Sequence, residues 1–156
     1  MAPGLEGQMS EKNVSVSTRQ IVVFGLGEEE YALSIGDVQE IIRHVEPRTV
    51  ASDVPWILGV ISLRGKIIPV CDLAARLGVA RGERQATKII VVEGAGHTVG
   101  LVVDDVIEVL TIDEAAIEQL NLVSGGAHSV AKVGERLIVL LSGESIFESS
   151  TLADAV

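Results

Sequence analysis

Short apolar runs alternate with polar turns through most of the chain, and the runs are rich in Val, Ile and Leu. Such a pattern predicts a series of short β-strands arranged as a sandwich or barrel. Residues 73–77 predict one or two helical turns that end at Gly78. Residues 112–120 mix both patterns, and a helix is one interpretation of them. We expect strands near residues 21–24, 31–35, 56–63, 67–71, 88–92, 99–103, 106–110, 129–133 and 136–141, with a further short element at 38–43.

The most distinctive local pattern is a hairpin. Apolar runs at 56–63 and 67–71 flank the pair Arg64-Gly65. A two-residue hairpin turn needs positive φ, which glycine adopts without strain, so the pair favours a tight turn with Arg64 at an exposed tip. Pro69 has no N–H to donate, so its strand is expected at a sheet edge or bent at that point.

The two halves of the chain match each other at a nearly fixed spacing. A shift of 68 positions places residues 21–24 on 89–92 and Glu40 on Glu108, and a shift of 70 places 67–70 on 137–140. The matched charged positions favour a duplication over a chance likeness of apolar strands. The sequence therefore predicts a mainly β protein made of two copies of one unit, with short helices.

The predicted boundaries follow from composition. Residues 1–18 mix Gly, Ser, Glu and Lys without a period, which indicates a disordered leader, and 149–156 are expected to be a similar tail. The ordered part, 19–148, divides roughly into 19–85 and 86–148, and strand exchange between these parts is left open. Because each unit alone has a thin core, the two should pack together as lobes with a groove between them.

Charge and composition narrow the possible partners. The chain carries 12 Lys and Arg against 22 Asp and Glu, a net charge of −10, with only four aromatic Phe, Tyr and Trp residues. Phosphate backbones and anionic membranes are repelled by such a surface, and few aromatics are available to stack on bases. No apolar run approaches the ~18 residues of a membrane span, and no signal peptide is visible. We therefore expect no nucleic-acid partner, no membrane insertion and a cytoplasmic location.

Candidate catalytic residues do not form a recognisable set. Cys71, the only cysteine, lies within an apolar run and is expected to be a buried core residue. Adjacent residues of a strand point to opposite faces, so Asp104 and Asp105 are not expected to act together as acid and base. Gly25-Leu26-Gly27 lacks the third glycine of a dinucleotide-binding loop, and no serine lies in a G-x-S-x-G motif.

Metal or cofactor binding is equally unsupported. His44, His97 and His128 are far apart in the sequence, and none has the helical spacing of paired ligands. We predict no catalytic site, no metal and no cofactor.

Residues 55–73, PWILGVISLRGKIIPVCDL, carry a family resemblance. They resemble the G-V-I-N-L-R-G-x-I-I-P-V-x-D-L motif of the CheW-type chemotaxis coupling proteins, with Ser62 where the family usually has Asn. Residues 24–33 with 38–41, and residues 99–106, resemble two other blocks of that family in the same order. The resemblance covers roughly Arg19 to Phe147.

This resemblance implies two SH3-like five-stranded β-barrels packed on each other and an adaptor function. The family joins the cytoplasmic hairpin tips of chemoreceptors to a CheA-type histidine kinase, whose regulatory domain has the same fold and pairs barrel to barrel. A groove lined by aliphatic side chains could accept a helical hairpin tip. The resemblance implies no cofactor and no catalysis.

Six positions are carried over as candidate protein-binding residues. Arg64 matches the conserved turn arginine of the family, and the other five match or lie near its partner-contacting segments. The candidates are Arg64, Val38, Glu40, Gly59, Ile35 and Trp56.

Five of the six candidates, all except Ile35, also have a structural interpretation. Arg64 could be a solvated turn residue and Glu40 part of a solvated face. Val38 and Trp56 could be core residues, and Gly59 could mark a bulge or a close backbone approach.

Two other functional classes stay open. The chain could be a piece of a larger signalling protein, such as an adaptor fused to a receiver domain, although its length leaves no room for a receiver pattern. It could instead be a ligand-binding barrel or a small enzyme unrelated to chemotaxis. That reading needs a polar pocket with shifted pKa values.

Overall fold

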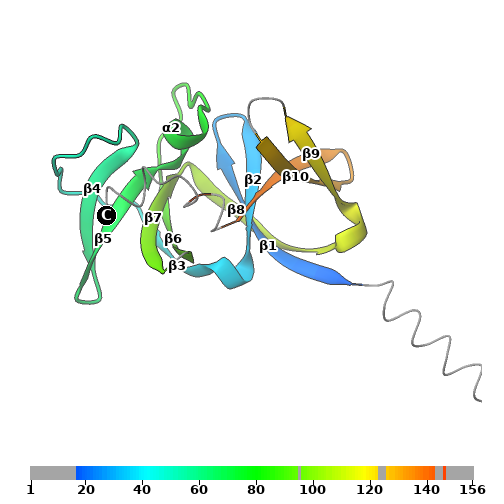
Figure 1. The fold of residues 1–156 in the computed structure, drawn as a ribbon, viewed down its shortest axis with the longest axis horizontal. Coiled ribbons are helices and arrows are strands. Elements are labelled where there is room, and N and C mark those ends of the chain that lie inside the picture. The colour runs from blue at the N-terminus through cyan, green and yellow to red at the C-terminus, as the bar shows by residue number, and fades with distance from the viewer. Residues whose placement is uncertain (1–16, 95, 123–125, 143–145, 147–156) are drawn as a thin grey trace, which may run out of the picture.

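The computed structural model describes residues 17–94, 96–122, 126–142 and 146, and the side chains of 121–128 are not described. The predicted leader lies outside the described residues apart from Ser17 and Thr18, and the predicted tail lies outside them entirely. Two antiparallel-rich sheets form two lobes side by side (Figure 1). The mainly β prediction is confirmed.

The six-stranded lobe lies on the right in Figure 1. Its sheet has the order β8 (Asp105–Asp113), β1 (Thr18–Leu26), β2 (Glu29–Ser34), β11 (Arg136–Leu141), β10 (Gly126–Val133) and β9 (Ile117–Leu122). All neighbours are antiparallel except β2 and β11, which run parallel.

The five-stranded lobe lies on the left in Figure 1. Its sheet has the order β3 (Val38–Arg43), β6 (Lys88–Gly94), β7 (His97–Val103), β5 (Lys66–Asp72) and β4 (Ile57–Leu63). Here β5 and β7 form the parallel pair. The short 3-10 helices η1 (Ile35–Asp37) and η2 (Glu114–Ala116) lead into β3 and β9.

The predicted helix at 73–77 is confirmed as α2 (Leu73–Leu77). Asp72 caps its start by accepting a hydrogen bond from the backbone N–H of Ala75, and Gly78 ends it in the left-handed conformation. The helical interpretation of 112–120 is wrong over most of that range. Asp113 ends β8 and Ile117 begins β9, because 117–122 finds a partner strand in β10.

The two sheets repeat one another strand for strand. A shift of 68 residues takes β1, β2 and β3 to β6, β7 and β8, and a shift of 70 takes β4 and β5 to β10 and β11. The sheet orders then coincide, with β9 as an added edge strand. Even the register agrees, because the pair Cys71–Leu101 in one parallel ladder corresponds to Leu141–Leu33 in the other.

The sheets do not follow the sequential halves. The six-stranded sheet takes β1 and β2 from the first half, and the five-stranded sheet takes β6 and β7 from the second. This is the arrangement that strand exchange between two equivalent units produces. A boundary near 85/86 falls between elements of the same five-stranded lobe.

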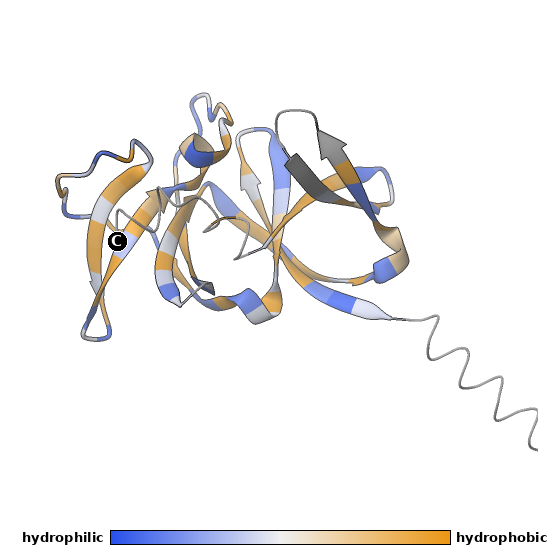
Figure 2. Cartoon of the chain, viewed as in Figure 1, coloured by the Kyte–Doolittle hydropathy of each residue, from blue (hydrophilic) through white to orange (hydrophobic). Residues whose placement is uncertain are grey.

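Apolar residues occur mainly along the strands, whereas the turns are largely polar (Figure 2). The largest core cluster joins the lobes, with Phe24 and Leu33 from one sheet against Ile90 and Leu101 from the other. Each sheet also has a smaller core of its own. Among the described residues, no helix has the length and apolar character needed to cross a membrane.

Candidate functional site

The tip of the β4–β5 hairpin is tied to strand β3 by one side-chain pair. Arg64 donates from Nε to Oε2 and from Nη2 to Oε1 of Glu40, both at 3.0 Å. This two-pronged geometry matches a guanidinium to a carboxylate and fixes their relative orientation. The Arg64 side chain remains 76% exposed, whereas that of Glu40 is 26% exposed. Most of the guanidinium surface is therefore still available to another molecule.

The backbone of Arg64 is itself unusual. Its φ is 51°, which makes it the only residue other than glycine with positive φ among those the structure describes. The left-handed region costs such a residue about 1–2 kcal/mol. In the equivalent turn of the other lobe Gly134 has a φ of 62°. An arginine thus stands where glycine would be easier, as residues at functional sites often do.

The ion pair shapes the protonation of both partners. Hydrogen bonds from Arg64 are the largest cause that lowers the pKa of Glu40, and partial burial opposes them. The same hydrogen bonds raise the pKa of Arg64. Both groups therefore keep their charges across the physiological pH range. The surface carries a guanidinium and a carboxylate side by side.

The six-stranded lobe has a similar ion-pair arrangement at the equivalent place. We call the arrangement at Arg64 and this one, at Arg136, the two hairpin clasps. Arg136, near the β10–β11 turn, donates from Nη1 to Glu108 at 2.8 Å and from Nη2 to Glu30 at 2.8 Å. Glu108 is the counterpart of Glu40, because a shift of 68 residues relates them. Both barrels therefore close the same end with an arginine from a hairpin and a glutamate from β3 or β8.

Ile35 and Val38 lead into Glu40 through η1 and β3. Ile35 is 43% exposed, whereas Val38 is half-buried and packs against the core that joins the lobes. A register shift between Val38 and Glu40 locally bends the strand. The structure thus brings Arg64 and Glu40 together and places Ile35 and Val38 on the adjoining segment.

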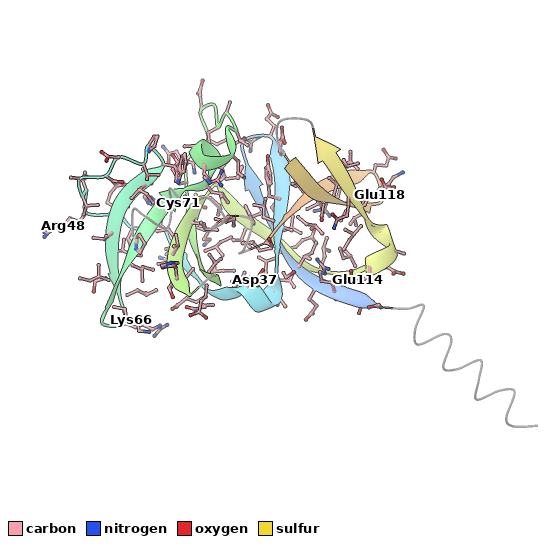
Figure 3. All side chains as sticks on the ribbon, in the orientation of Figure 1. Asp37, Arg48, Lys66, Cys71, Glu114 and Glu118 are labelled. Carbon is pink, nitrogen blue, oxygen red and sulfur yellow. The ribbon has the colours of Figure 1, made fainter. Side chains whose placement is uncertain are left out.

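Gly59 and Trp56 lie toward the opposite end of β4 from Arg64. Gly59 precedes Arg64 by five positions, which is roughly 16 Å along a strand. Figure 3 places Lys66 near the hairpin tip and Arg48 at the outer edge of the lobe, away from that tip.

Gly59 and Trp56 make contacts within the five-stranded lobe itself. A Cβ on Gly59 would overlap the backbone carbonyl oxygen of Arg48, and this close approach lets Arg48 pair with Val60 beside the edge of the sheet. Trp56 is half-buried, and the guanidinium of Arg76 lies 5.1 Å above its ring.

Exposed apolar side chains near both clasps were not identified from the sequence. Ile67 is 74% exposed and its counterpart Leu137 is 65% exposed, both just after the hairpin turns. Ile41 and Val109, another equivalent pair, are 39% and 51% exposed. The repeat spacing together with strand alternation could have indicated them, because each follows a charged or turn residue at the same repeat position.

The lobes differ in charge. Residues 35–103, which hold the five-stranded lobe, contain eight basic and seven acidic residues. Residues 17–34 and 104–141, which hold the six-stranded lobe, contain three basic and ten acidic residues. The two clasps therefore lie in different electrostatic surroundings, and the acidic lobe favours a basic partner.

A polar hollow of about 580 Å³ lies between the loop after β3 and the loop after α2. Its walls mix opposite charges, with Arg81 and Arg84 near Glu46 and Asp72. Among the described residues no group of three or more His, Cys, Asp and Glu is placed to hold a metal ion. Burial raises the pKa of Cys71 to about 12, so its thiol stays protonated and unreactive.

Known proteins resemble this chain over most of its length. A family model described as a CheW-like domain matches residues 20–151. The probable chemotaxis protein CheW of Rhizobium etli is 32% identical over 146 residues, covering 89% of this chain and 94% of that protein. The chemotaxis protein CheW of Bacillus subtilis is 29% identical, covering 88% and 92%. The crystal structure of the scaffolding protein TtCheW from Thermoanaerobacter tengcongensis matches with a TM-score of 0.73 at 39% identity, covering 80% of this chain and 84% of that one.

Proposed function

This chain belongs to the family of CheW-like domains, and from this premise we propose that it is a non-catalytic scaffold that couples chemoreceptors to a CheA-type histidine kinase. Its partners are the regulatory domain of the kinase and the cytoplasmic hairpin tip of the receptor. Its place is the cytoplasm, at a receptor array. It needs no cofactor, because it acts by holding other proteins together.

The observation that carries the proposal is the strained and exposed Arg64 held against Glu40. An arginine in a left-handed turn position, where the other lobe has Gly134, costs conformational free energy, and residues strained in this way are concentrated at functional sites. Its guanidinium is oriented in advance by Glu40, which reduces the entropy lost when a partner binds. We assign this surface, with Ile35, Val38 and Glu40, to partner binding.

Gly59 and Trp56 have a supporting role in this proposal. Both act on the shape of the five-stranded lobe from the far end of β4, through the close backbone approach at Arg48 and the packing of Arg76. Substitution of either should change partner binding only through the fold.

The two barrel ends offer two separate docking surfaces. The apolar side chains of Ile67 and Leu137 stand beside the two clasps, so each surface combines an exposed apolar centre with charged neighbours. Pairing through one barrel end would bury on the order of 800 Å² per partner. Several weak contacts of this size gain strength by avidity in an array.

Calorimetric titration into the isolated regulatory domain of the kinase tests the proposal. We expect saturable 1:1 binding that Arg64→Ala weakens. Arg48→Ala is the matched control, because it removes the same charge from an exposed position at the outer edge of the lobe, away from the hairpin tip. Absence of binding up to high micromolar concentrations, or equal weakening by both substitutions, would contradict it.

A further inference from the structure

The two sequence halves share every core. The first half ends with α2 and the second half begins with β6, and each of the three apolar clusters draws on both. In the six-stranded sheet, Ile21, Val23 and Ala32 from the first half pack against Ile112, Ala131 and Ile138 from the second. In the five-stranded sheet, Ile61, Ile68 and Val70 pack against Ile89, Val91 and Val102. Neither half can bury its apolar strands alone.

The strand ladders cross between the halves in the same way. Four pairings join one half to the other, β1 with β8, β2 with β11, β3 with β6, and β5 with β7. The covalent connection between the halves is a single linker, residues 78–87. Its central residues 82–85 are exposed.

Within the linker, Arg81 and Thr87 both contact one buried residue, so the chain between them folds back on itself. Asp104, which is 7% exposed, lies 2.7 Å through Oδ1 from Nε of Arg81, and its carbonyl oxygen accepts the N–H of Thr87 at 3.0 Å. Between these anchors, Gly82 has a φ of 65° and the N–H of Arg84 donates to the carbonyl oxygen of Arg81 at 3.4 Å. Opening the linker would remove this turn, the ion pair of Arg84 with Glu28 at 3.9 Å and the packing of Ala86 on the core of the five-stranded sheet.

We infer that two copies of this chain exchange halves, the first half of each packing on the second half of the other. The product is two complete two-lobed bodies joined by two opened linkers. Every core and ladder is preserved, because each half meets a partner identical to its own. Glu30 from one copy would then meet Arg136 and Glu108 from the other.

Concentration decides between the closed and the exchanged forms. A short linker gives its two halves an effective concentration in the millimolar range, so exchange competes as the protein approaches that concentration. The six residues from Gly82 to Thr87 reach roughly 20 Å when extended, enough to pass between bodies that lie side by side. Exchange after folding is slow because all four crossing ladders must open first.

The exchanged dimer would be bivalent. Arg64 and Glu40 both belong to the first half, so the clasp stays within one chain and each dimer carries two copies of it. This consequence rests on the proposed function, whereas the exchange itself does not. A bivalent scaffold could hold two partners together without a new contact surface.

Engineered disulfides distinguish exchange from ordinary dimerisation. Gln20 and Thr111 are exposed, face each other across β1 and β8 and belong to different halves. With Cys71→Ser as background, Gln20→Cys and Thr111→Cys should link within a chain in the closed form and between chains in the exchanged form. The control pair, Ser62→Cys and Ile67→Cys, lies opposite within the first half and should link within a chain in both forms.

The full-length variants are refolded at concentrations from roughly 1 µM to 1 mM, oxidised and run on non-reducing gels. We expect covalent dimers from the cross-half pair in a fraction that rises with concentration, and none from the control pair. A second cross-half pair, Arg43→Cys with Lys88→Cys, serves if the first fails to fold. No interchain link at any concentration, or equal links in the control, overturns the inference.

A linker substitution gives an independent measurement. Valine at position 82 is strained in the closed turn and relaxed in an extended linker, so Gly82→Val should raise the exchanged fraction several-fold. Gly134→Val adds the same strain at a hairpin that exchange does not open, so it should leave the fraction unchanged. An equal response from the two variants would contradict the linker's role.

Discussion

Arg64 and Gly134 occupy the same turn position in the two lobes, and both have a left-handed backbone, with φ of 51° and 62°. The backbone conformation is therefore the same at this position, and only the hairpin of the five-stranded lobe carries a side chain there. That side chain is anchored to Glu40 and yet remains largely exposed. Because a left-handed backbone at this position does not require an arginine, the difference supports a role of the Arg64 side chain in partner binding.

Replacing Arg64 by glycine should separate stability from binding. Arg64→Gly removes the backbone strain together with the ion pair, whereas Arg64→Ala removes the ion pair and keeps the strain. We expect Arg64→Gly to have the higher free energy of unfolding of the two, and both to bind the kinase domain equally weakly. Denaturant unfolding and calorimetric titration measure the two quantities. A glycine variant that binds like the wild type would show that the side chain has no role in coupling.

The clasp should weaken in acid. Hydrogen bonds from Arg64 lower the pKa of Glu40 in the folded state, so the folded protein holds its proton less tightly than the unfolded chain. The stabilising effect is therefore complete above the ordinary glutamate pKa of 4.5 and is lost as the pH falls through the lowered value. An NMR titration of the Glu40 carboxyl should show this lowered midpoint, and Arg64→Gln should return it toward 4.5. An unchanged midpoint in the variant would mean that the pair is not formed in solution.

Several features of the fold could be predicted from the sequence. The 64–65 hairpin and the burial of Cys71 rest on local patterns, the repeat rests on a comparison of the two halves, and the structure agrees with each. Strand β9 was missed because its residues mix strand and helix patterns, and only pairing with β10 settles them.

Pairings between distant residues could not be predicted. Equivalent strands of two copies have interchangeable patterns, so the sequence cannot tell an exchanged arrangement from two sequential barrels. The contact between Arg64 and Glu40 spans 24 positions and joins the β4–β5 turn to β3, which is next to neither β4 nor β5 in the sheet. The left-handed backbone of Arg64 was also beyond the sequence, since only Gly65 signals positive φ.

Alkaline pH should destabilise the protein through two buried groups. Burial is the main cause that raises the pKa of Cys71 from 9.0 to about 12, and it likewise raises that of Tyr31 from 10.0 to about 12. The folded state keeps these protons while the unfolded chain loses them, so the free energy of unfolding should fall as the pH rises from about 9 to 12. Denaturant melts across this range measure the fall, and Cys71→Ala should reduce its slope.

Thiol labelling offers a direct check of the same burial. At pH 8 a thiol reagent should react with Cys71 only as fast as the protein opens, and at the ordinary rate once denaturant is added. Fast labelling of the native protein would show that reagents reach the thiol and that burial does not raise its pKa in solution.

Glycine substitutions in the β4–β5 hairpin should differ sharply in cost. At Gly65 a Cβ meets open space, so Gly65→Ala adds only the strain of a φ of 81°, about 1–2 kcal/mol. At Gly59 a Cβ would overlap the carbonyl oxygen of Arg48, and the backbone pairing of Arg48 with Val60 must shift. Gly59→Ala should therefore lower the free energy of unfolding by about 3 kcal/mol, the upper end for ordinary substitutions. Because Gly59 lies away from Arg64, kinase binding by the remaining folded protein should be nearly unchanged, measured at a temperature well below the midpoint. A Gly59→Ala protein that is as stable as the wild type but binds poorly would reverse this assignment and make Gly59 a contact residue.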